Sequence, residues 1–313
     1  GCSSRVKSCS TRVKISVMVM LNENTHIIET IFFQKGGVPM TINHITVVGA
    51  GVMGRGIAYV SALAGFKTTL VDISESQLQD AIETTKQTAE KGVARGKLTE
   101  EKKQMLLENL QTSTDLASVS KETDFLIEAV PEKRSLKQSV MQEAEAHARD
   151  GVIFTSNTST ISPTELGSYT NRPEKFAVMH FFNPVHIMKL VEIVRGLETS
   201  DETVDVVREV AEKMGKETVE VNEFPGFVTS RISALVGNEA FHMLQEGVAS
   251  AEDIDKAIKL GLNFPMGPLE LGDLVGLDAR LNNLRYLHEK LGDKFRPAPR
   301  LEQYVQAGRL GRK

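Results

Sequence analysis

His44-Ile-Thr-Val-Val-Gly-Ala-Gly-Val-Met-Gly-Arg-Gly56 joins an apolar run to a closely spaced set of glycines. The run Ile45–Val48 predicts a short buried strand of a parallel sheet, and residues 57–64 predict the helix that follows it. Three glycines fit the pattern G-x-G-x-x-G: Gly49, Gly51 and Gly54. The first permits a tight turn, the second lets the backbone approach a pyrophosphate, and the third lets the helix pack on the strand. The stretch, Met53 included, therefore predicts a dinucleotide site at a helix N-terminus, where free N–H groups face phosphates.

The second predicted strand, Thr68-Thr-Leu-Val-Asp72, ends on a carboxylate 21 residues after Gly51. An acid at this distance is expected to bind the ribose 2′-OH of the dinucleotide. A carboxylate accepts a hydrogen bond from a free 2′-OH and repels a 2′-phosphate, so Asp72 favours NAD over NADP. The glycine pattern alone would also suit an ordinary Gly-rich turn. Pattern, strand, helix and acid together make the nucleotide site the stronger interpretation.

The composition is that of an ordinary globular protein, with 313 residues, 41% hydrophobic and 25% charged. This length suits two domains. The net charge of −4 gives no reason to expect a nucleic-acid partner. No apolar run approaches the roughly 18 residues of a membrane span, so we expect no membrane insertion. We also expect no metal site.

Residues 1–39 differ from the rest of the chain. They contain both cysteines and carry five Lys or Arg against two Asp or Glu, a charge of +3 that leaves −7 for the remainder. Their serine- and arginine-rich start followed by an apolar patch resembles a targeting leader, but no small-residue cleavage site follows. We prefer a tag, or translation upstream of a start at Met40. The expected location is then cytoplasmic, or the mitochondrial matrix if the segment is a transit peptide.

From Met40 onward, strands alternate with helices as far as residue 221, and the chain is helical thereafter. Expected strands cover 45–48, 68–72, 124–130, 152–159, 175–181, 189–194 and 217–221. Expected helices cover 57–64, 75–91, 100–110, 135–148, a segment after the capping box at Ser162, 201–214, 229–245, 250–260, 269–275, 279–291 and 300–307. The pattern predicts an α/β fold: an N-terminal Rossmann-type doubly wound, mostly parallel sheet over 40–223, and a C-terminal all-α domain over 224–313. Helical domains of this kind commonly dimerise, so we expect a homodimer.

Small polar residues crowd the C-terminal end of the strand expected over 152–159. In an open parallel sheet, ligands bind outside the carboxyl ends of the strands. Asn157 and Ser159 are therefore candidates for contact with the nicotinamide or the substrate.

His180 and Glu192 lie 12 residues apart on the two arms of an expected strand–turn–strand. A carboxylate bound to one ring nitrogen fixes the tautomer of an imidazole and leaves the other nitrogen as a base. Among apolar neighbours, a histidine such as His180 is usually structural. Downstream of an NAD motif a catalytic role is favoured, because oxidation of an alcohol needs a proton acceptor beside the hydride acceptor.

Lys91, Arg95 and Lys97 cluster after the long polar helix. A solvated basic face is the default interpretation. The alternative is that Arg95 and Lys97 bind the phosphates of a substrate tail.

The chain from about Met40 to its end resembles the short-chain L-3-hydroxyacyl-CoA dehydrogenase family, and within it the bacterial 3-hydroxybutyryl-CoA dehydrogenases. The motifs are Val-Val-Gly-Ala-Gly-Val-Met-Gly54, Glu-Ala-Val-Pro-Glu132, Ser-Asn-Thr-Ser159, His-Phe-Phe-Asn-Pro184, Lys-Leu-Val-Glu192, Pro-Gly-Phe227 and Pro-Met-Gly-Pro-Leu-Glu270. The resemblance implies NAD-dependent interconversion of (S)-3-hydroxyacyl-CoA and 3-oxoacyl-CoA, with an acyl-CoA as the small-molecule partner.

The resemblance also implies roles for individual residues. It makes His180 the general base, Glu192 its orienting carboxylate, Ser159 the donor to the substrate oxygen, Asn183 a neighbour of the nicotinamide, and Glu132 and Lys137 part of the NAD site. The family often has asparagine where this chain has Ser230, which weakens or water-bridges that substrate contact. Relatives also continue through a Gly- and Tyr-containing tail where this sequence stops at Lys313.

Two other functions stay open at this point. One is a relative that oxidises a free hydroxy acid or sugar acid, which would not need the basic cluster near Arg95. The other is a structural or NAD-sensing protein without turnover, which the joint presence of His180, Glu192 and Ser159 argues against.

Overall fold

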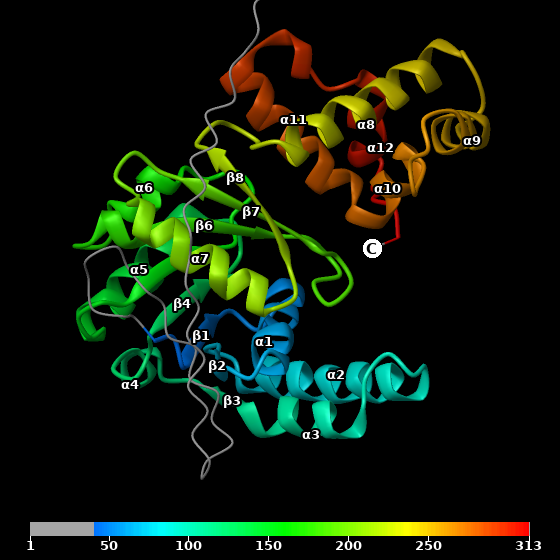
Figure 1. The fold of residues 1–313 in the computed structure, drawn as a ribbon. Helices are drawn as coiled ribbons and strands as arrows, with labels where there is room; N and C mark the ends of the chain where they lie inside the picture. The colour runs from blue at the N-terminus through cyan, green and yellow to red at the C-terminus, as the bar shows by residue number, and fades with distance from the viewer. Residues whose placement is uncertain (1–40, 313) are drawn as a thin grey trace, which may run out of the picture.

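The computed structural model describes residues 41–312, so the expectations for residues 1–39 lie outside the described part. Its centre is one eight-stranded sheet with the order β3-β2-β1-β4-β5-β6-β7-β8 (Figure 1). All neighbouring strands from β3 to β6 in this order are parallel. Strand β7 is antiparallel to β6, and β8 is parallel to β7. The chain winds outward from β1 to β3 and returns on the other side at β4. Ligands of such sheets bind at this reversal, between β1 and β4.

The elements follow one another as the alternating pattern predicts. The strands are β1 His44–Val48, β2 Lys67–Val71, β3 Leu110–Ser113, β4 Phe125–Glu128, β5 Ile153–Ser156, β6 Phe176–Phe181, β7 Leu190–Arg195 and β8 Glu217–Asn222. The helices of the sheet region are α1 Val52–Leu63, α2 Glu75–Ala94, α3 Glu100–Asn109, α4 Leu116–Ser120, α5 Arg134–His147, α6 Pro163–Gly167 and α7 Asp201–Lys213. The helices after the sheet are α8 Thr229–Glu246, α9 Ala251–Gly261, α10 Pro268–Val275, α11 Leu277–Leu291 and α12 Pro299–Gln306.

Helices cover both faces of the sheet because successive side chains of a strand point to opposite sides. Ile45 and Val47 of β1 pack in a core with α1, α2, α3 and α7, whereas Val48 belongs to a second core with α4, α5 and α6. Both faces are buried, which explains why the central strands are near-continuous apolar runs.

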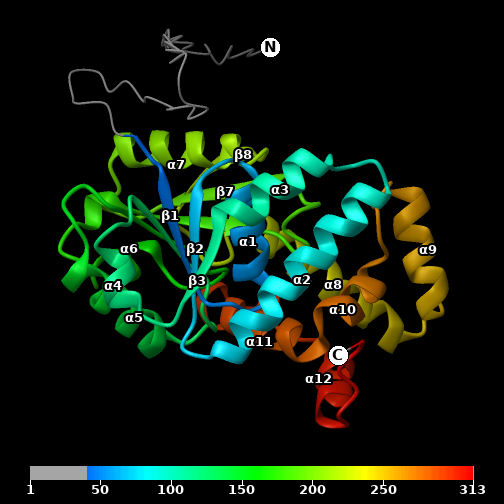
Figure 2. The same cartoon turned by 90° about the horizontal axis from the view of Figure 1, so that it is seen from below.

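The helices α8 to α12 pack around a third core of their own, formed by residues between Ala234 and Leu301. Figures 1 and 2 show this helical group beside the sheet rather than on one of its faces. The paired helices α2 and α3 lie beside α1 (Figure 2). Among residues 41–312, none of the helices has the length and apolar character needed to cross a bilayer.

Two elements were not expected from the sequence, β3 and α4. The strand Leu110-Gln-Thr-Ser113 pairs only with β2, and none of its side chains is fully buried. An edge strand of this kind lacks the apolar run that reveals the inner strands. The short helix α4 is started by Asp115, whose carboxylate accepts a hydrogen bond from Ser118 N at 2.8 Å.

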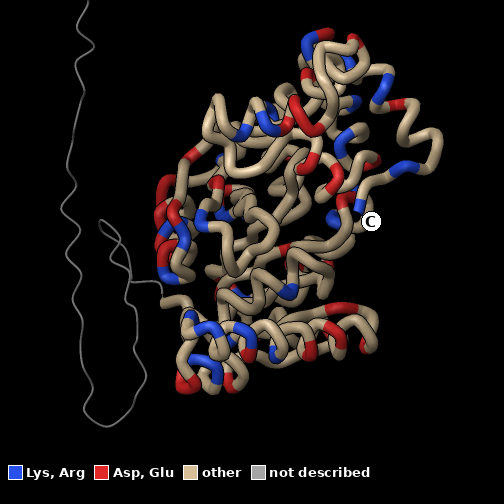
Figure 3. The backbone as a smooth tube through the Cα atoms, turned by 90° about the vertical axis from the view of Figure 1, so that its right-hand side faces the viewer, with Lys and Arg blue, Asp and Glu red and all other residues tan. Residues whose placement is uncertain are grey.

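Basic and acidic residues are interspersed along the outer helices and turns, and the central segments of the chain are mostly uncharged (Figure 3). Glu128, Lys137 and Glu192 are the most deeply buried charged residues among residues 41–312, each at most 1% exposed. A charge buried this deeply requires partners, and all three lie at the site described next.

Candidate active site

The glycine turn after β1 has the geometry of a phosphate cradle. Gly49 has a positive φ of 105°, and a Cβ on Gly54 would lie 1.7 Å from the Gly49 carbonyl oxygen. A Cβ on Gly51 would meet nothing within 4 Å, so the turn is open on that side. Helix α1 begins there without a capping side chain. Its first N–H groups are free to bind an anion, so the turn fits the pyrophosphate of NAD.

Asp72 follows β2 at the same edge of the sheet. Its Oδ2 accepts from Ala50 N and its Oδ1 from Ser74 N, at 2.8 and 2.9 Å. Each oxygen keeps a lone pair for another donor, and the side chain is half-buried, so the carboxylate fits the ribose hydroxyls. Met53 lies in the first turn of α1, and its side chain packs against the core.

His180 and Glu192 are direct cross-strand neighbours in the antiparallel pair of β6 and β7. His180 Nδ1 lies 2.8 Å from Glu192 Oε2. Since a carboxylate only accepts, Nδ1 carries the proton and Nε2 is left as the base. His180 is nearly buried at 8% exposure, and Glu192 is fully buried.

Glu192 is also bound by the first residue of α8. Its Oε1 accepts from Thr229 N at 2.9 Å, and its Oε2 accepts from Thr229 Oγ1 at 3.1 Å. Burial alone would raise the pKa of Glu192, but the hydrogen bonds from His180 and Thr229 lower it below its ordinary value. Glu192 is thus held as an anion at the start of a helix that belongs to the other part of the chain.

Aromatic rings complete the surroundings of His180. The ring centroids of Phe182 and Phe227 lie 4.6 and 5.7 Å from that of the imidazole. Phe227 adopts a left-handed φ of 49°, which is rare for a bulky residue. This turn, made with Gly226 at φ 77°, directs the start of α8 toward Glu192.

Glu132 holds the loop that carries Ser159. Its Oε1 accepts hydrogen bonds from the hydroxyls of Thr158 and Thr160 and from the N–H groups of Ser159 and Thr160. The Ser159 hydroxyl has no hydrogen-bond partner within residues 41–312, so it is free to bind a ligand. Asn157 is less free, because its Oδ1 accepts from Phe181 N at 2.9 Å. Asn157 thereby fixes the end of β6 directly after His180.

Lys137 lies beneath this loop rather than on its surface. Its ammonium binds both oxygens of Glu128 at 2.8 and 3.0 Å, Glu132 Oε2 at 3.1 Å and the Val130 carbonyl at 3.3 Å. With 1% exposure, Lys137 can act on a cofactor through Glu132 and the Val130 segment.

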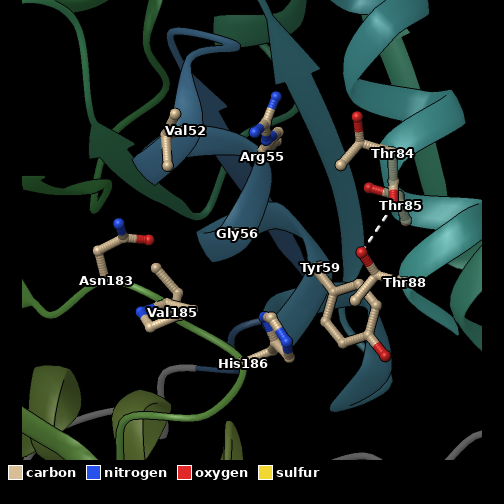
Figure 4. A pocket seen from close by; sticks show the side chains of 11 residues that line it. Val52, Arg55, Gly56, Tyr59, Thr84, Thr85, Thr88, Asn183, Val185 and His186 are labelled. Carbon is tan, nitrogen blue, oxygen red and sulfur yellow. Dashed lines mark hydrogen bonds between the residues drawn. The ribbon is translucent and has the colours of Figure 1, made fainter. Parts of the chain in front are cut away.

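A small cavity of about 150 Å³ opens beside the glycine turn (Figure 4). It lies between α1, α2 and the loop after β6. Its lining residues are Val52, Arg55, Gly56, Tyr59, Thr84, Thr85, Thr88, Asn183, Pro184, Val185 and His186. Asn183 thus shares one cavity with side chains of α1 and α2.

The loop from Asn183 to Met188 is tied down from behind by Lys216. Its buried ammonium donates to the carbonyls of Val185 and Met188. Val185 is packed against Gly56, where an added Cβ would lie 2.9 Å from the valine. These contacts fix the wall of the cavity that carries Asn183.

Three further predicted site residues take no part in the contacts described so far. Arg95 and Lys97 are exposed in the turn between α2 and α3, and neither forms an ion pair within the described part of the chain. Ser230 is half-buried in the first turn of α8, next to Thr229. The sequence prediction missed Arg55, Tyr59, Thr88, Lys216 and Thr229. Only Thr229 could have been suspected, because it directly precedes Ser230 in a recognised motif.

Comparison with known proteins identifies one family over almost the whole described chain. Residues 44–224 match the family model of the 3-hydroxyacyl-CoA dehydrogenase NAD-binding domain, and residues 226–313 match that of the C-terminal domain. A probable 3-hydroxybutyryl-CoA dehydrogenase of Bacillus subtilis is 43% identical over 275 residues, which are 88% of this chain and 96% of that protein. The mitochondrial hydroxyacyl-coenzyme A dehydrogenase of Rattus norvegicus is 39% identical. This match covers 87% of this chain and 89% of that protein.

Among solved structures, the (S)-3-hydroxybutyryl-CoA dehydrogenase of Ralstonia eutropha superposes with a TM-score of 0.83 at 42% identity. The match covers 87% of this chain and 96% of that one. The glycine turn, the acid after β2 and the His–Glu pair therefore occur in a chain that belongs to the 3-hydroxyacyl-CoA dehydrogenase family, with residues 44–224 as its NAD-binding domain.

Proposed function

We propose that this chain interconverts (S)-3-hydroxyacyl-CoA and 3-oxoacyl-CoA with NAD, and that 3-hydroxybutyryl-CoA is its substrate. The observation that carries the proposal is the 2.8 Å bond between His180 Nδ1 and Glu192 Oε2. It leaves Nε2 of His180 as a base at the edge of the sheet where the NAD turn lies.

In this proposal, His180 Nε2 accepts the proton of the 3-hydroxyl group, and the buried anion of Glu192 stabilises the imidazolium that forms. The free hydroxyl of Ser159 donates to the same substrate oxygen. Bound NAD supplies the acceptor for the hydride that leaves C3. In the reverse direction, His180 returns the proton to the carbonyl oxygen.

Gly51 and the first turn of α1 would hold the pyrophosphate of NAD, and Asp72 the adenosine ribose. Asn183, Asn157 and the loop held by Glu132 would surround the nicotinamide end. Lys137 would support this arrangement from below, through its ion pairs with Glu128 and Glu132.

The acyl-CoA would enter beside α2. The cavity that leads from Asn183 past Thr88 lies on the way to the exposed cations Arg95 and Lys97 at the end of that helix. About seven residues of helix, roughly 10 Å, separate Thr88 from Arg95. This spacing suits an extended thioester tail with phosphates at its far end, and Ser230 would lie near the thioester.

The test is NADH-dependent turnover of acetoacetyl-CoA, acetoacetyl-pantetheine and free acetoacetate, with His180→Gln as the inactive control. We expect acetoacetyl-CoA to have the highest kcat/KM by at least about tenfold. The double variant Arg95→Ala/Lys97→Ala should raise KM for acetoacetyl-CoA several-fold and leave KM for acetoacetyl-pantetheine unchanged, because the latter has no nucleotide phosphates. Equal efficiency with free acetoacetate would favour a hydroxy-acid dehydrogenase instead.

We further propose that residues 40–223 form the NAD-binding domain and that residues 224–313 form a helical substrate and dimerisation domain. The separate core of α8 to α12 supports this division. Exposed apolar side chains on this part of the chain support a homodimer. Seven of them are between 46% and 76% exposed: Phe224, Val228, Ile232, Leu260, Leu262, Leu274 and Val275. Sedimentation velocity tests this, and a monomer at micromolar concentration would exclude it.

Residues 1–39 are proposed to be a tag or an upstream extension, and the protein to act in the cytoplasm. The absence of cysteine from 10 to 313 suits a reducing compartment. A chain that starts at Met40 should fold and turn over like the full chain. If residues 1–39 fused to a fluorescent protein direct it to mitochondria, the matrix location replaces the cytoplasmic one.

A further inference from the structure

Thr229 shares an acceptor atom with His180. Its hydroxyl donates to Glu192 Oε2 at 3.1 Å, and His180 Nδ1 lies 2.8 Å from the same oxygen. The Thr229 N–H binds the other oxygen, Oε1, at 2.9 Å. Both oxygens of the fully buried carboxylate are therefore bound by the first residue of α8.

The origin of this contact is the turn before α8. Gly226 and Phe227 both adopt positive φ values, and Phe227 packs its ring 5.7 Å from the imidazole. Helix α8 has no capping side chain of its own within the described residues. Glu192, which comes from β7, takes the place of that cap and brings its negative charge to the positive end of the helix.

We propose that Thr229 is a positioning residue that sets the basicity of His180 by sharing the Glu192 carboxylate with it. A hydroxyl that donates to Oε2 withdraws part of the negative charge that would otherwise stabilise the imidazolium. It also keeps the carboxylate from rotating away from Nδ1. The proposal rests on the acid–base role of His180 and Glu192 given under the proposed function.

No other titratable group of the described residues acts on Glu192 in a way that would hide an effect of Thr229 on His180. Within residues 41–312, the titratable group that acts on the Glu192 carboxylate is His180 from β6, and α8 contributes the N–H and hydroxyl of Thr229. The rings that pack on His180, Phe182 and Phe227, do not titrate. A change at Thr229 therefore reaches His180 through Glu192.

The test compares Thr229→Val, which removes the hydroxyl at constant shape, with Thr229→Ser, which keeps it. Thr229→Ala is the second variant without hydroxyl, in case valine impairs folding. All three keep the N–H bond to Oε1. Thr68→Val is the control, because the Thr68 hydroxyl bonds only the Phe66 carbonyl and β2 lies four strands from β6 in the sheet.

The readouts are the pH profile of 3-hydroxybutyryl-CoA oxidation and the NMR titration of the His180 imidazole. Without the hydroxyl, the imidazolium is more stable, so the basic form needed for oxidation is reached at higher pH. We expect Thr229→Val and Thr229→Ala to move the rising limb and the NMR midpoint upward by roughly 0.5–1 pH unit. We also expect kcat to fall about threefold to tenfold, with KM for NAD unchanged. Thr229→Ser and Thr68→Val should behave like the unchanged protein.

A midpoint in folded Thr229→Val or Thr229→Ala equal to that of Thr229→Ser would overturn the role of Thr229. Failure of the underlying function is a different result, because His180→Gln would then retain its kcat. Since the NMR midpoint needs no turnover, the two failures cannot be confused.

Discussion

The NAD turn and the His180–Glu192 pair lie at the same edge of one sheet, yet they are built in opposite ways. The turn uses backbone N–H groups and missing side chains within the short segment from Gly49 to Gly54, with Asp72 one strand later. The pair uses side chains from β6 and β7 and is completed by Thr229, 37 residues beyond Glu192. The turn needs open space for a phosphate next to its backbone, whereas the pair needs the buried negative charge of Glu192 beside His180.

This difference determines how each part fails when it is changed. Adding atoms damages the turn, because its function depends on what is absent. Removing a donor or a charge damages the pair, because its function depends on groups that compensate one another. The following substitutions test this contrast.

The largest effect is expected at the pair. His180→Gln should lower kcat by roughly 10²–10⁴-fold, because the proton acceptor is lost. Glu192→Gln should also lower kcat, with KM changing less. Since the two act as one unit, the double variant should be little worse than His180→Gln alone. Steady-state kinetics and NAD titration check this. A near-normal kcat in folded His180→Gln would make His180 a structural histidine.

The glycines of the turn provide a matched pair of alanine substitutions. Gly54→Ala places a Cβ 1.7 Å from a backbone oxygen, so we expect a loss of about 3 kcal/mol or more in the free energy of unfolding. Gly51→Ala meets nothing within 4 Å, so its stability should change by less than about 1 kcal/mol. Its affinity for NAD should fall about tenfold or more, because the methyl group occupies the space of the pyrophosphate.

Denaturant unfolding and NAD titration separate the two variants. If Gly51→Ala bound NAD normally, the open side of the turn would not be the phosphate site.

Asp72 tests whether charge also matters on the nucleotide side. We expect a strong preference for NADH over NADPH, because the carboxylate repels a 2′-phosphate. Asp72→Ala should reduce the preference, and a nearby added arginine should reduce it further. The ratio of kcat/KM values for the two cofactors is the measurement, and a ratio near one in the unchanged protein would contradict the assignment.

Glu209 on α7 shows what a half-buried carboxylate does without the partners that Glu192 has. Within residues 41–312 its Oε2 has no hydrogen-bond partner, and burial together with Asp205 and Glu212 raises its pKa to about 7. Because the folded-state pKa is raised, stability contributed at low pH is lost as the pH rises from about 4.5 to 7. For a fully buried carboxylate, a pKa shift of this size would change the free energy of unfolding by about 3 kcal/mol. Glu209 is only half-buried, so solvent screening reduces the expected change to about 1 kcal/mol.

Glu209→Gln should therefore raise the Tm by about 2 °C at pH 8 and leave it unchanged at pH 4.5. Glu198→Gln, at an exposed loop position, is the control and should show no such difference. An equal Tm for Glu209→Gln and the unchanged protein at pH 8 would contradict the raised pKa.

The contrast also explains what could be predicted from the sequence. The family, the fold class and the cofactor are confirmed, because motif and alternating pattern are local. The antiparallel arms that carry His180 and Glu192 are also found as expected. The roles of the individual residues stay predictions.

Other features depend on contacts between distant segments. Thr229 binds Glu192 only because two positive φ values aim α8 at β7, and no local pattern encodes this. The resemblance places Lys137 in the NAD site, but its enclosure by Glu128 and Glu132 follows only from the folded structure. The edge strand β3 was missed because its polar residues carry no periodic signal.

The reversal of β7 has a consequence for how this family can tolerate insertions. His180 and Glu192 face one another because β6 and β7 pair residue for residue, so this alignment is set within the strands and not by the length of the loop between them. A single residue inserted within β7 before Glu192 would instead turn the carboxylate to the opposite face of the sheet. Insertions should therefore be excluded from 190–195, and the loop 183–188 should also keep its length, because Lys216 and Gly56 hold it in place and Asn183 lines the cavity.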